Sequence, residues 1–344
     1  MSRRMNRRRV AVLTALAVVV AGAAAVIGYV VWPRSTDFEK AAALLPADTL
    51  RVTWTDWDRL RDEFSGPDFV TNVQDRDLSV SSLASSAQDI DDAVGFDPTT
   101  DAGWEILGQG RDGMVVVLEL DVDLDDVASG FEDAGWTRPS SDAMSGAVWG
   151  GGADVVAGAG LVTPELQFVA FDEEKGLLIG SDNADHLESS MDVVTGDTDG
   201  LDVTPLTDGL EQDPLDATAF IDDYACEALD MSQADEDAQS VADGLVAEAG
   251  GVTPLNGYLV ALSADRRLTV VFRFADDEQA SHDETSRAAL LTAEDPGQMV
   301  AYPELVTSPR TSSDGDRVVI SGQVDDDSAP MANLASGPVL LAAC

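Results

Sequence analysis

The sequence predicts an α+β protein with an N-terminal transmembrane helix, followed by antiparallel sheets with helices packed on one face and arranged in two similar halves. Three observations support this fold class. A long uncharged run lies near the N-terminus, several segments alternate apolar and polar residues as β-strands do, and others space apolar residues as helices do. Strand, hairpin and helix patterns occur twice along the chain, which is why two halves are expected.

The transmembrane helix is predicted over Val10 to Trp32, where no residue is charged. A helix of this length spans about 34 Å, and the hydrocarbon core of a bilayer is about 30 Å thick. Five arginines and no acidic residue lie within residues 1–9, so the positive-inside rule keeps this tail in the cytoplasm. We therefore expect a single-pass protein of the plasma membrane, with a spacer over residues 33–45 and the rest of the chain outside the cytoplasm.

A cleaved signal peptide is the alternative to this anchor. The triplet Ala21-Gly22-Ala23 has the small-x-small pattern of a cleavage site. The apolar run nevertheless continues to Trp32, which makes it longer than a usual signal core. A lipid-modified N-terminus is excluded, because no cysteine precedes Cys226.

The composition restricts the partners that the protein can bind. Its 64 acidic residues far outnumber its 20 basic ones, and the formal net charge is −44. Such a surface repels a polyanion, so nucleic acid is excluded as a partner. Most of the acids are expected to form a solvated surface that keeps the protein soluble.

The sequence contains two cysteines, Cys226 and Cys344, and both lie in the part expected to be exported. In an oxidising compartment two thiols are most simply interpreted as one disulfide. The alternatives are two free thiols or a bond between two molecules.

The first half is predicted to cover residues 46–204. Its expected strands are Leu50 to Thr55, Met114 to Leu120, Leu166 to Ala170 and Leu177 to Ile179, the last two joined in a hairpin. Its expected helices follow Asp56, cover residues 77–94, surround Val127 and Phe131, and run from Asn183 to Val194. Residues 150–160 and 197–213 are expected to form loops, because they are rich in glycine, proline and aspartate.

The second half is predicted to cover residues 205–344. Its expected strands are Ala217 to Ile221, Tyr258 to Leu262, Leu268 to Phe274, Arg317 to Val324 and Val339 to Ala343. A helix is expected over Asp276 to Leu291, and the segment Cys226 to Ala249 is expected to be mostly helical.

Three features of the exported part resemble a group of uncharacterised membrane-anchored envelope proteins of actinobacteria. They are the segment Leu44-Leu45-Pro46-Ala47-Asp48-Thr49 after the anchor, the stretch from Phe168 to Asp182 that ends in Gly-Ser-Asp, and the position of Cys344. The resemblance covers the layout of most of the exported part. It implies an envelope location and the disulfide, and it implies no activity and no catalytic residue.

The segment Gly108 to Gly113 matches the G-x-G-x-x-G spacing of dinucleotide-binding loops. Such a loop follows a strand and opens a helix, whereas this segment precedes the apolar strand that begins at Met114. We therefore interpret it as a turn, and no cofactor is predicted.

A calcium-binding loop is partly matched after the same strand. Asp121, Asp123, Asp125, Ser129 and Glu132 fit positions 1, 3, 5, 9 and 12 of the calcium-loop template. The sixth position holds an aspartate in place of the required glycine, and a strand rather than a helix precedes the segment. An acidic first helical turn is the favoured interpretation, and specific cation binding is the minor hypothesis.

No catalytic constellation is recognised. The sequence lacks a G-x-S-x-G elbow, and its histidines, His186 and His282, fall in polar helical segments. Ser181, Asp182 and His186 are close in sequence, but His186 is expected on a helix surface. Paired carboxylates of the glycosidase kind cannot be singled out among 64 acidic residues.

Three hypotheses for function follow. The leading one is a non-enzymatic envelope protein whose exported domain binds a partner protein, a small ligand or a wall component, because a long foldable chain carries no recognisable catalytic pattern. The second is a cell-surface hydrolase that acts through carboxylates, which predicts a cleft with two facing acids of raised pKa. The third is a cation-binding surface module.

Overall fold

The computed structural model describes residues 35–66, 69–140 and 146–344. The chain divides into two compact units, Met1–Thr36 and Asp37–Cys344, and the fold described below belongs to the second unit. The transmembrane segment predicted at Val10 to Trp32 lies outside the described residues. Within the described part of the chain, none of the helices has both the length and the apolar character needed to cross a membrane.

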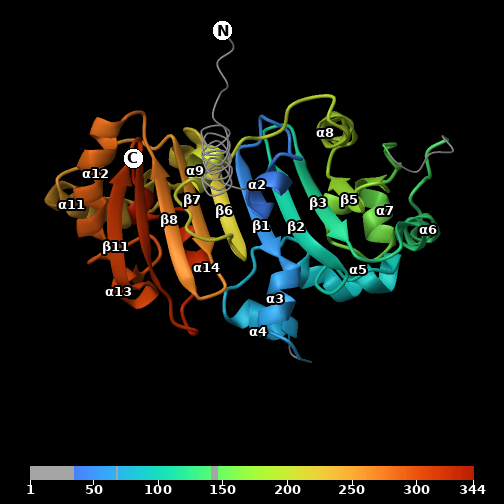
Figure 1. Ribbon diagram of the computed structural model, residues 1–344, viewed down its shortest axis with the longest axis horizontal. Helices are drawn as coiled ribbons and strands as arrows, with labels where there is room; N and C mark the ends of the chain where they lie inside the picture. Colours follow the sequence, from blue (N-terminus) through green and yellow to red (C-terminus); the bar gives the residue numbers. More distant parts are fainter. Residues whose placement is uncertain (1–34, 67–68, 141–145) are drawn as a thin grey trace, which may run out of the picture. The chain divides into compact units, whose positions relative to one another are not determined.

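Ten strands form one antiparallel sheet, which confirms the α+β class (Figure 1). The strand order is β11-β12-β8-β7-β6-β1-β2-β3-β5-β4. The strands are β1 (Arg51–Asp56), β2 (Ala102–Gln109), β3 (Met114–Leu120), β4 (Phe168–Asp172), β5 (Leu177–Ser181), β6 (Asp216–Ile221), β7 (Gly257–Leu262), β8 (Arg267–Arg273), β11 (Thr307–Asp314) and β12 (Arg317–Gln323). Two short strands, β9 (Glu294–Asp295) and β10 (Val300–Ala301), form a separate ladder.

The same strand order occurs in each half of the sheet. The order β1-β2-β3-β5-β4 in the first half corresponds to β6-β7-β8-β12-β11 in the second, and the halves join where β1 pairs with β6. Thr53 lies opposite Thr218 at the centre of this junction. The predicted boundary near residue 205 falls at α9 (Thr204–Thr207), directly ahead of β6 in the chain. Because the junction is a regular ladder, the two halves belong to one compact unit.

The other helices fill the connections between the strands. They are α2 (Asp37–Ala42), α3 (Trp57–Glu63), α4 (Phe69–Asp75), α5 (Ala87–Val94), α6 (Leu124–Ala134), α7 (Ala153–Gly158), α8 (Ala184–Thr195), α10 (Tyr224–Leu229), α11 (Glu236–Ala249), α12 (Asp277–Leu290), α13 (Tyr302–Leu305) and α14 (Pro330–Leu334). Short 3-10 turns occur at η1 (Ala84–Ser86), η2 (Pro164–Leu166), η3 (Met231–Gln233) and η4 (Leu340–Ala342).

Many helices begin at a side chain that accepts a hydrogen bond from their first turn. This N-cap role belongs to Asp56, Asp123, Asn183, Asp235 and Asp276. A short polar side chain at this position binds a backbone N–H that has no partner within the helix. Part of the acidic composition therefore specifies where helices start.

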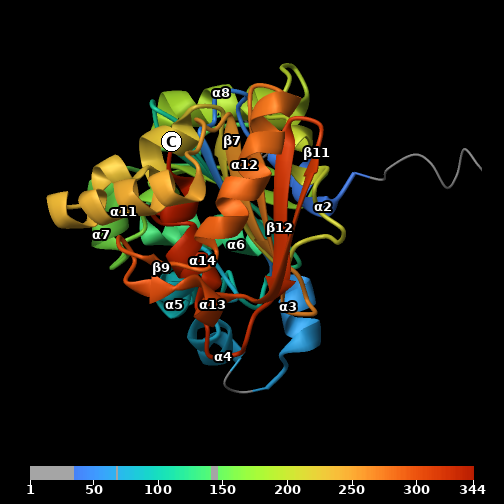
Figure 2. The same ribbon diagram turned by 90° about the vertical axis from the view of Figure 1, so that its left-hand side faces the viewer.

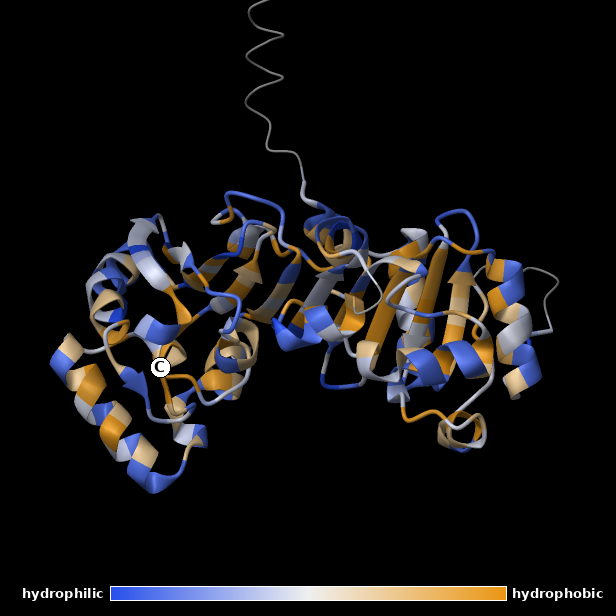
Figure 3. Ribbon diagram, turned by 90° about the horizontal axis from the view of Figure 1, so that it is seen from below, coloured by the Kyte–Doolittle hydropathy of each residue, from blue (hydrophilic) through white to orange (hydrophobic). Residues whose placement is uncertain are grey.

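Helices cover both faces of the sheet, which corrects the prediction of helices on one face. In Figure 2, α11 and α14 lie on one side of β12 and α2 lies on the other. The strand β3 explains the need for two layers, because Val116 packs into one apolar layer and Val117 into the other. Leu187 of α8 belongs to the same layer as Val117. Figure 3 shows the apolar strands in the interior and polar residues on the outer surfaces of the helices.

Two strands have no clear sequence signal. β2 does not alternate strictly, because most of its residues are buried on both faces. β11, with the sequence TSPRTSSD, is almost entirely exposed because it is the edge strand of the sheet. The loops expected over residues 150–160 and 197–213 also contain short helices, α7 and α9.

Two predicted elements are wrong. Residues 77–83 are not helical, and the helical segment begins only with η1 and α5. The segment Val339 to Ala343, predicted as the last strand, contains the 3-10 turn η4. The carbonyl groups of Leu341 and Ala343 accept hydrogen bonds from the buried Arg287 guanidinium. These two carbonyls are therefore not available to a neighbouring strand.

The predicted disulfide joins Cys226 of α10 to Cys344, with an Sγ–Sγ distance of 2.05 Å. The Cys344 backbone N–H also donates to Asp230 Oδ1 at 2.8 Å. The described part of the chain therefore contains no free cysteine. The bond ties the C-terminal segment to a helix in the middle of the sequence.

Candidate functional site

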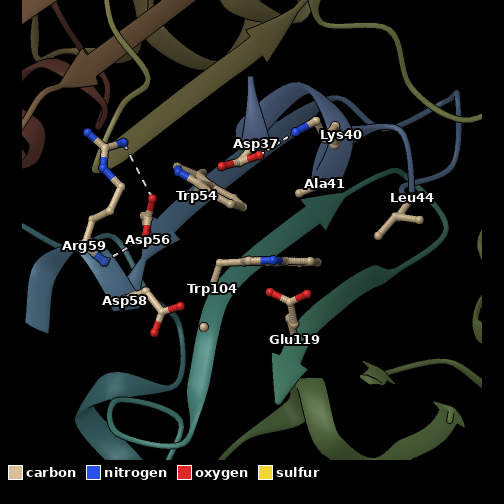
Figure 4. A pocket seen from close by; sticks show the side chains of 11 residues that line it. Asp37, Lys40, Ala41, Leu44, Trp54, Asp56, Asp58, Arg59, Trp104 and Glu119 are labelled. Atoms are coloured by element: carbon tan, nitrogen blue, oxygen red, sulfur yellow. Dashed lines mark hydrogen bonds and ion pairs between the residues drawn. The ribbon is translucent and has the colours of Figure 1, made fainter. Parts of the chain in front are cut away.

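A pocket of about 430 Å³ opens beside α2, over one end of β1, β2 and β3 (Figure 4). This volume is in the range of small-molecule binding sites. The lining consists of acidic, basic, aromatic and small residues. They are Asp37, Lys40, Ala41, Leu44, Trp54, Asp56, Asp58, Arg59, Gly103, Trp104 and Glu119.

Three of the lining residues form a row across adjacent strands. Asp56 on β1 lies opposite Trp104 on β2, and Trp104 lies opposite Glu119 on β3. Directly opposed residues of antiparallel strands point to the same face of the sheet. The three side chains therefore stand side by side, with the indole in the middle. The ladder is irregular between Ala102 and Trp104, so a local bend in β2 accompanies the pocket.

The Trp104 indole rests on a second tryptophan. Its ring stacks on Trp54, with ring centroids 5.6 Å apart and planes inclined by 30°. Trp54 is only 1% exposed, packs against Phe38 of α2 and donates its Nε1–H to the Pro214 carbonyl at 3.2 Å. Trp104 is half-buried, so part of its surface faces the pocket. The buried Trp54 thus fixes the orientation of the indole that a ligand can reach.

The Asp56 carboxylate is held by the first turn of α3. Its Oδ1 accepts the Arg59 backbone N–H at 3.0 Å, and its Oδ2 lies 3.6 Å from the Arg59 guanidinium. Burial raises the pKa of Asp56 to about 6, and the hydrogen bond and the positive charge of Arg59 keep it from rising further. Asp56 is therefore both a helix cap and a wall of the pocket.

Glu119 and Asp58 converge on Gly103. A Cβ atom placed on Gly103 would lie 3.1 Å from Glu119 Oε2 and 3.4 Å from Asp58 Oδ2, so the missing side chain leaves room between the two carboxylates. Burial raises the pKa of Glu119, a hydrogen bond from Trp104 lowers it, and the nearby charges of Asp121 and Asp58 raise it. Negative charge is thus concentrated beside the indole.

Carboxylates outnumber cationic groups in the lining, and both cations already have carboxylate partners. Lys40 Nζ lies 2.6 Å from Asp37 Oδ1, and Arg59 pairs with Asp56. Asp58 pairs with Arg61, which is outside the lining. Among the ion pairs of the described residues, none includes Glu119. The pocket therefore has an excess of acidic groups next to Trp104.

The residues that match the calcium-loop template, the minor hypothesis from the sequence, have other partners. Asp123 caps α6 and accepts the Asp125 backbone N–H at 2.9 Å. Glu132 pairs with Arg138 at 3.3 Å, and Asp121 lies 3.9 Å from Arg61. In the described ranges, no group of three or more His, Cys, Asp or Glu residues has an arrangement that could hold a metal ion. The favoured interpretation, an acidic first helical turn, matches α6.

Ser181, Asp182 and His186 likewise have structural surroundings. The Ser181 hydroxyl donates to the Met114 carbonyl at 2.7 Å, and Asp182 accepts the Met114 N–H at 2.9 Å. His186 is in the first turn of α8, as the sequence predicts. Of the segment Gly108 to Gly113, predicted as a turn, residues 110–113 form the turn between β2 and β3, where the Gly110 N–H donates to the Gly113 carbonyl at 2.9 Å, and residues 108–109 are the end of β2.

Sequence reasoning did not identify the pocket. Trp104 and Gly103 belong to β2, which is not indicated as a strand, and Glu119 is the single acid in an apolar run. That isolated acid is a usable signal, because a charged residue in a buried strand needs a special environment. Its partners became visible only with the register of the three strands.

Comparison with known proteins adds no assignment, since no protein-family model, curated protein or solved structure matches this chain. The resemblance to actinobacterial envelope proteins therefore stays a prediction.

Proposed function

We propose that the protein is a membrane-anchored binding module outside the cytoplasm, and that it holds a small ligand in the pocket over β1, β2 and β3. The observation that carries this proposal is the half-buried Trp104 indole, which is backed by Trp54 and flanked by the carboxylates of Asp56 and Glu119. An aromatic surface with a few polar groups around it is typical of small-molecule sites.

The position of the pocket on strands supports a binding role. Side chains on paired strands lose little freedom when a ligand arrives, because backbone pairing and packing already hold them. Trp54 is fixed by Phe38 and Pro214, and Asp56 is fixed by the start of α3. The site is therefore organised before a ligand binds.

A carboxylate hydrolase is the second candidate, because two pocket acids, Asp56 and Glu119, have raised pKa values. A raised pKa suits a general acid near neutral pH. The row of side chains argues against this role. β1 and β3 are two strand spacings apart, about 9–10 Å, and Trp104 stands between the two acids. Glycosidase carboxylates instead face each other across the scissile bond, with room for the substrate between them.

Calorimetric titration of the full-length protein in detergent tests the binding proposal. Choline, cellobiose and acetate represent organic cations, neutral sugars and anions. We expect saturable binding of at least one compound, its loss in Trp104→Leu and its partial retention in Trp104→Phe. The control is Val162→Ala, which changes an exposed apolar residue outside the pocket lining.

Two results would contradict a binding module. One is binding that survives Trp104→Leu. The other is turnover of p-nitrophenyl glycosides that disappears in both Asp56→Asn and Glu119→Gln, which would favour the hydrolase.

A further inference from the structure

We propose that the ligand of this pocket is a small organic cation of the quaternary ammonium type, with its positive charge over Trp104 and between the carboxylates of Glu119 and Asp58. The inference rests on the proposed function and adds the chemical class of the ligand. Three independent features of the pocket carry it: the accessible indole, the space above Gly103, and the charge balance of the lining.

The indole provides the first contact. The face of a tryptophan carries negative electrostatic potential and attracts cations, above all when the cation is partly removed from water. Trp104 is half-buried and its orientation is fixed by the stacked Trp54, so the cation would meet a rigid surface. Among the cation–π contacts of the described residues, none joins Lys40 or Arg59 to the Trp104 ring. These two side chains form ion pairs with Asp37 and Asp56 instead.

The space above Gly103 provides the second contact. Oxygen atoms of Glu119 and Asp58 both lie within 3.4 Å of the position that a Cβ atom on Gly103 would occupy. A methylated ammonium group that enters this part of the pocket would meet a carboxylate on each side. An added methyl group would lie 3.1 Å from Glu119 Oε2 and 3.4 Å from Asp58 Oδ2, so it would occupy the space between the two acids.

The charge balance of the lining favours a cation over other ligand classes. Four acids and two bases line the pocket. Three of the acids pair with Lys40, Arg59 and Arg61, and Glu119 has no ion pair among the described residues, so the lining keeps an excess negative charge that repels an anion. A neutral sugar could donate hydrogen bonds to the carboxylates, but it would leave their excess negative charge unbalanced, whereas an organic cation balances it. A bare metal ion prefers a compact shell of oxygen ligands, whereas this pocket measures about 430 Å³ and includes an indole. The net charge of −44 also attracts cations to the protein from a distance.

The test compares choline with 3,3-dimethyl-1-butanol, which has nearly the same shape but no charge, and with cellobiose. All three are titrated into the full-length protein in detergent at neutral pH. We expect choline to bind at least about tenfold more tightly than its neutral isostere, because the cation–π and carboxylate contacts both require the charge.

Variants locate the bound cation. Trp104→Leu should abolish choline binding, and Glu119→Gln should weaken it about tenfold. Gly103→Ala should also weaken it by filling the space between the carboxylates, with an unchanged melting temperature, because the end of the Glu119 side chain can move aside. Glu188→Gln, a change to an exposed residue of α8, should leave binding unchanged.

The outcomes separate the two proposals. Equal binding of choline and its isostere, or tighter binding of cellobiose with dependence on Trp104, would overturn the cationic class and leave the pocket as a binding site. Failure of all three compounds to bind would overturn the cationic class. The binding proposal would then depend on the titration with acetate. Choline binding that is insensitive to Trp104→Leu would contradict both.

Discussion

Arg287 and Asp283 form an ion pair in which both side chains are fully buried, with 3.0 Å between Arg287 Nε and Asp283 Oδ1. They are one turn apart on α12. The guanidinium also donates to the Leu341, Ala343 and Thr253 carbonyls. The pair therefore connects α12 to the C-terminal segment, and the Arg287 guanidinium lies over the rings of Phe272 and Phe274, at 4.9 and 5.4 Å from their centroids.

Replacing Asp283 should be strongly destabilising. Asp283→Ala would leave the buried Arg287 charge without its partner, and removal of one member of a buried ion pair typically costs about 3–5 kcal/mol. The measurement is the free energy of unfolding by chemical denaturation. Glu278→Gln, an exposed change on the same helix, is the control. A loss for Asp283→Ala no larger than that of the control would show that the pair is dispensable.

Asp216 should make stability depend on pH. Its side chain is 0% exposed and accepts hydrogen bonds from the Val80 N–H at 3.0 Å and the Thr55 hydroxyl at 3.3 Å. Burial raises its pKa well above the usual value. The folded state therefore binds a proton at the Asp216 carboxyl group more tightly than the unfolded state does. The contribution of Asp216 to stability is greatest in acid. It declines as the pH rises above about 4, the ordinary pKa of an aspartate.

Asp216→Asn removes this titration. The variant should therefore be more stable relative to wild type at pH 7 than at pH 4, as measured by denaturation at the two values. Asp112→Asn, at an exposed position, should show no such difference. If Asp216→Asn changes the free energy of unfolding by the same amount at pH 4 and pH 7, the carboxyl group of Asp216 keeps its ordinary pKa.

Reduction of the disulfide should lower stability without releasing the C-terminal segment. Cys226 and Cys344 are separated by 118 residues, and closing such a loop is worth roughly 4–5 kcal/mol in the chain-entropy model, with measured gains often smaller. Denaturation with and without reductant gives the difference, and mass spectrometry of the unreduced protein should show the linked peptides. Full thiol labelling of the native protein would contradict the bond.

The predicted anchor should place the folded unit outside the cytoplasm. Because arginines precede the apolar run from Val10 to Trp32, a reporter fused at the C-terminus should be active outside the cytoplasm, and the protein should stay with the membrane after a salt wash. Recovery of a soluble form that begins near Ala24 would show cleavage of a signal peptide instead.

Asp123 should act as a helix cap and not as a calcium ligand. Asp123→Ala should cost about 1 kcal/mol of stability, because the first turn of α6 loses its cap. Calcium and magnesium at equal concentration should raise the melting temperature of wild type and variant by similar amounts, through screening of the acidic surface. A saturable calcium-specific rise that disappears in Asp123→Ala would revive the cation-site hypothesis.

The sequence by itself determined the local elements of this protein. Alternation and helical spacing depend on neighbours within a few residues, so strands such as β3 and β6, the β7–β8 hairpin and the helices that follow N-cap residues could be recognised from the chain alone. The disulfide could be expected because the chain contains two cysteines. β11 escaped recognition because an exposed edge strand pairs through its backbone, which leaves its side chains without an apolar pattern.

Only the tertiary structure decided how these elements combine. The strand order, the helices on both faces and the buried Arg287–Asp283 pair all depend on contacts between distant segments. The candidate site is the clearest case, because Asp56, Trp104 and Glu119 are far apart in sequence and become neighbours through the registers of β1, β2 and β3. A sequence pattern reports which face a side chain takes, whereas strand pairing decides which side chains meet on that face.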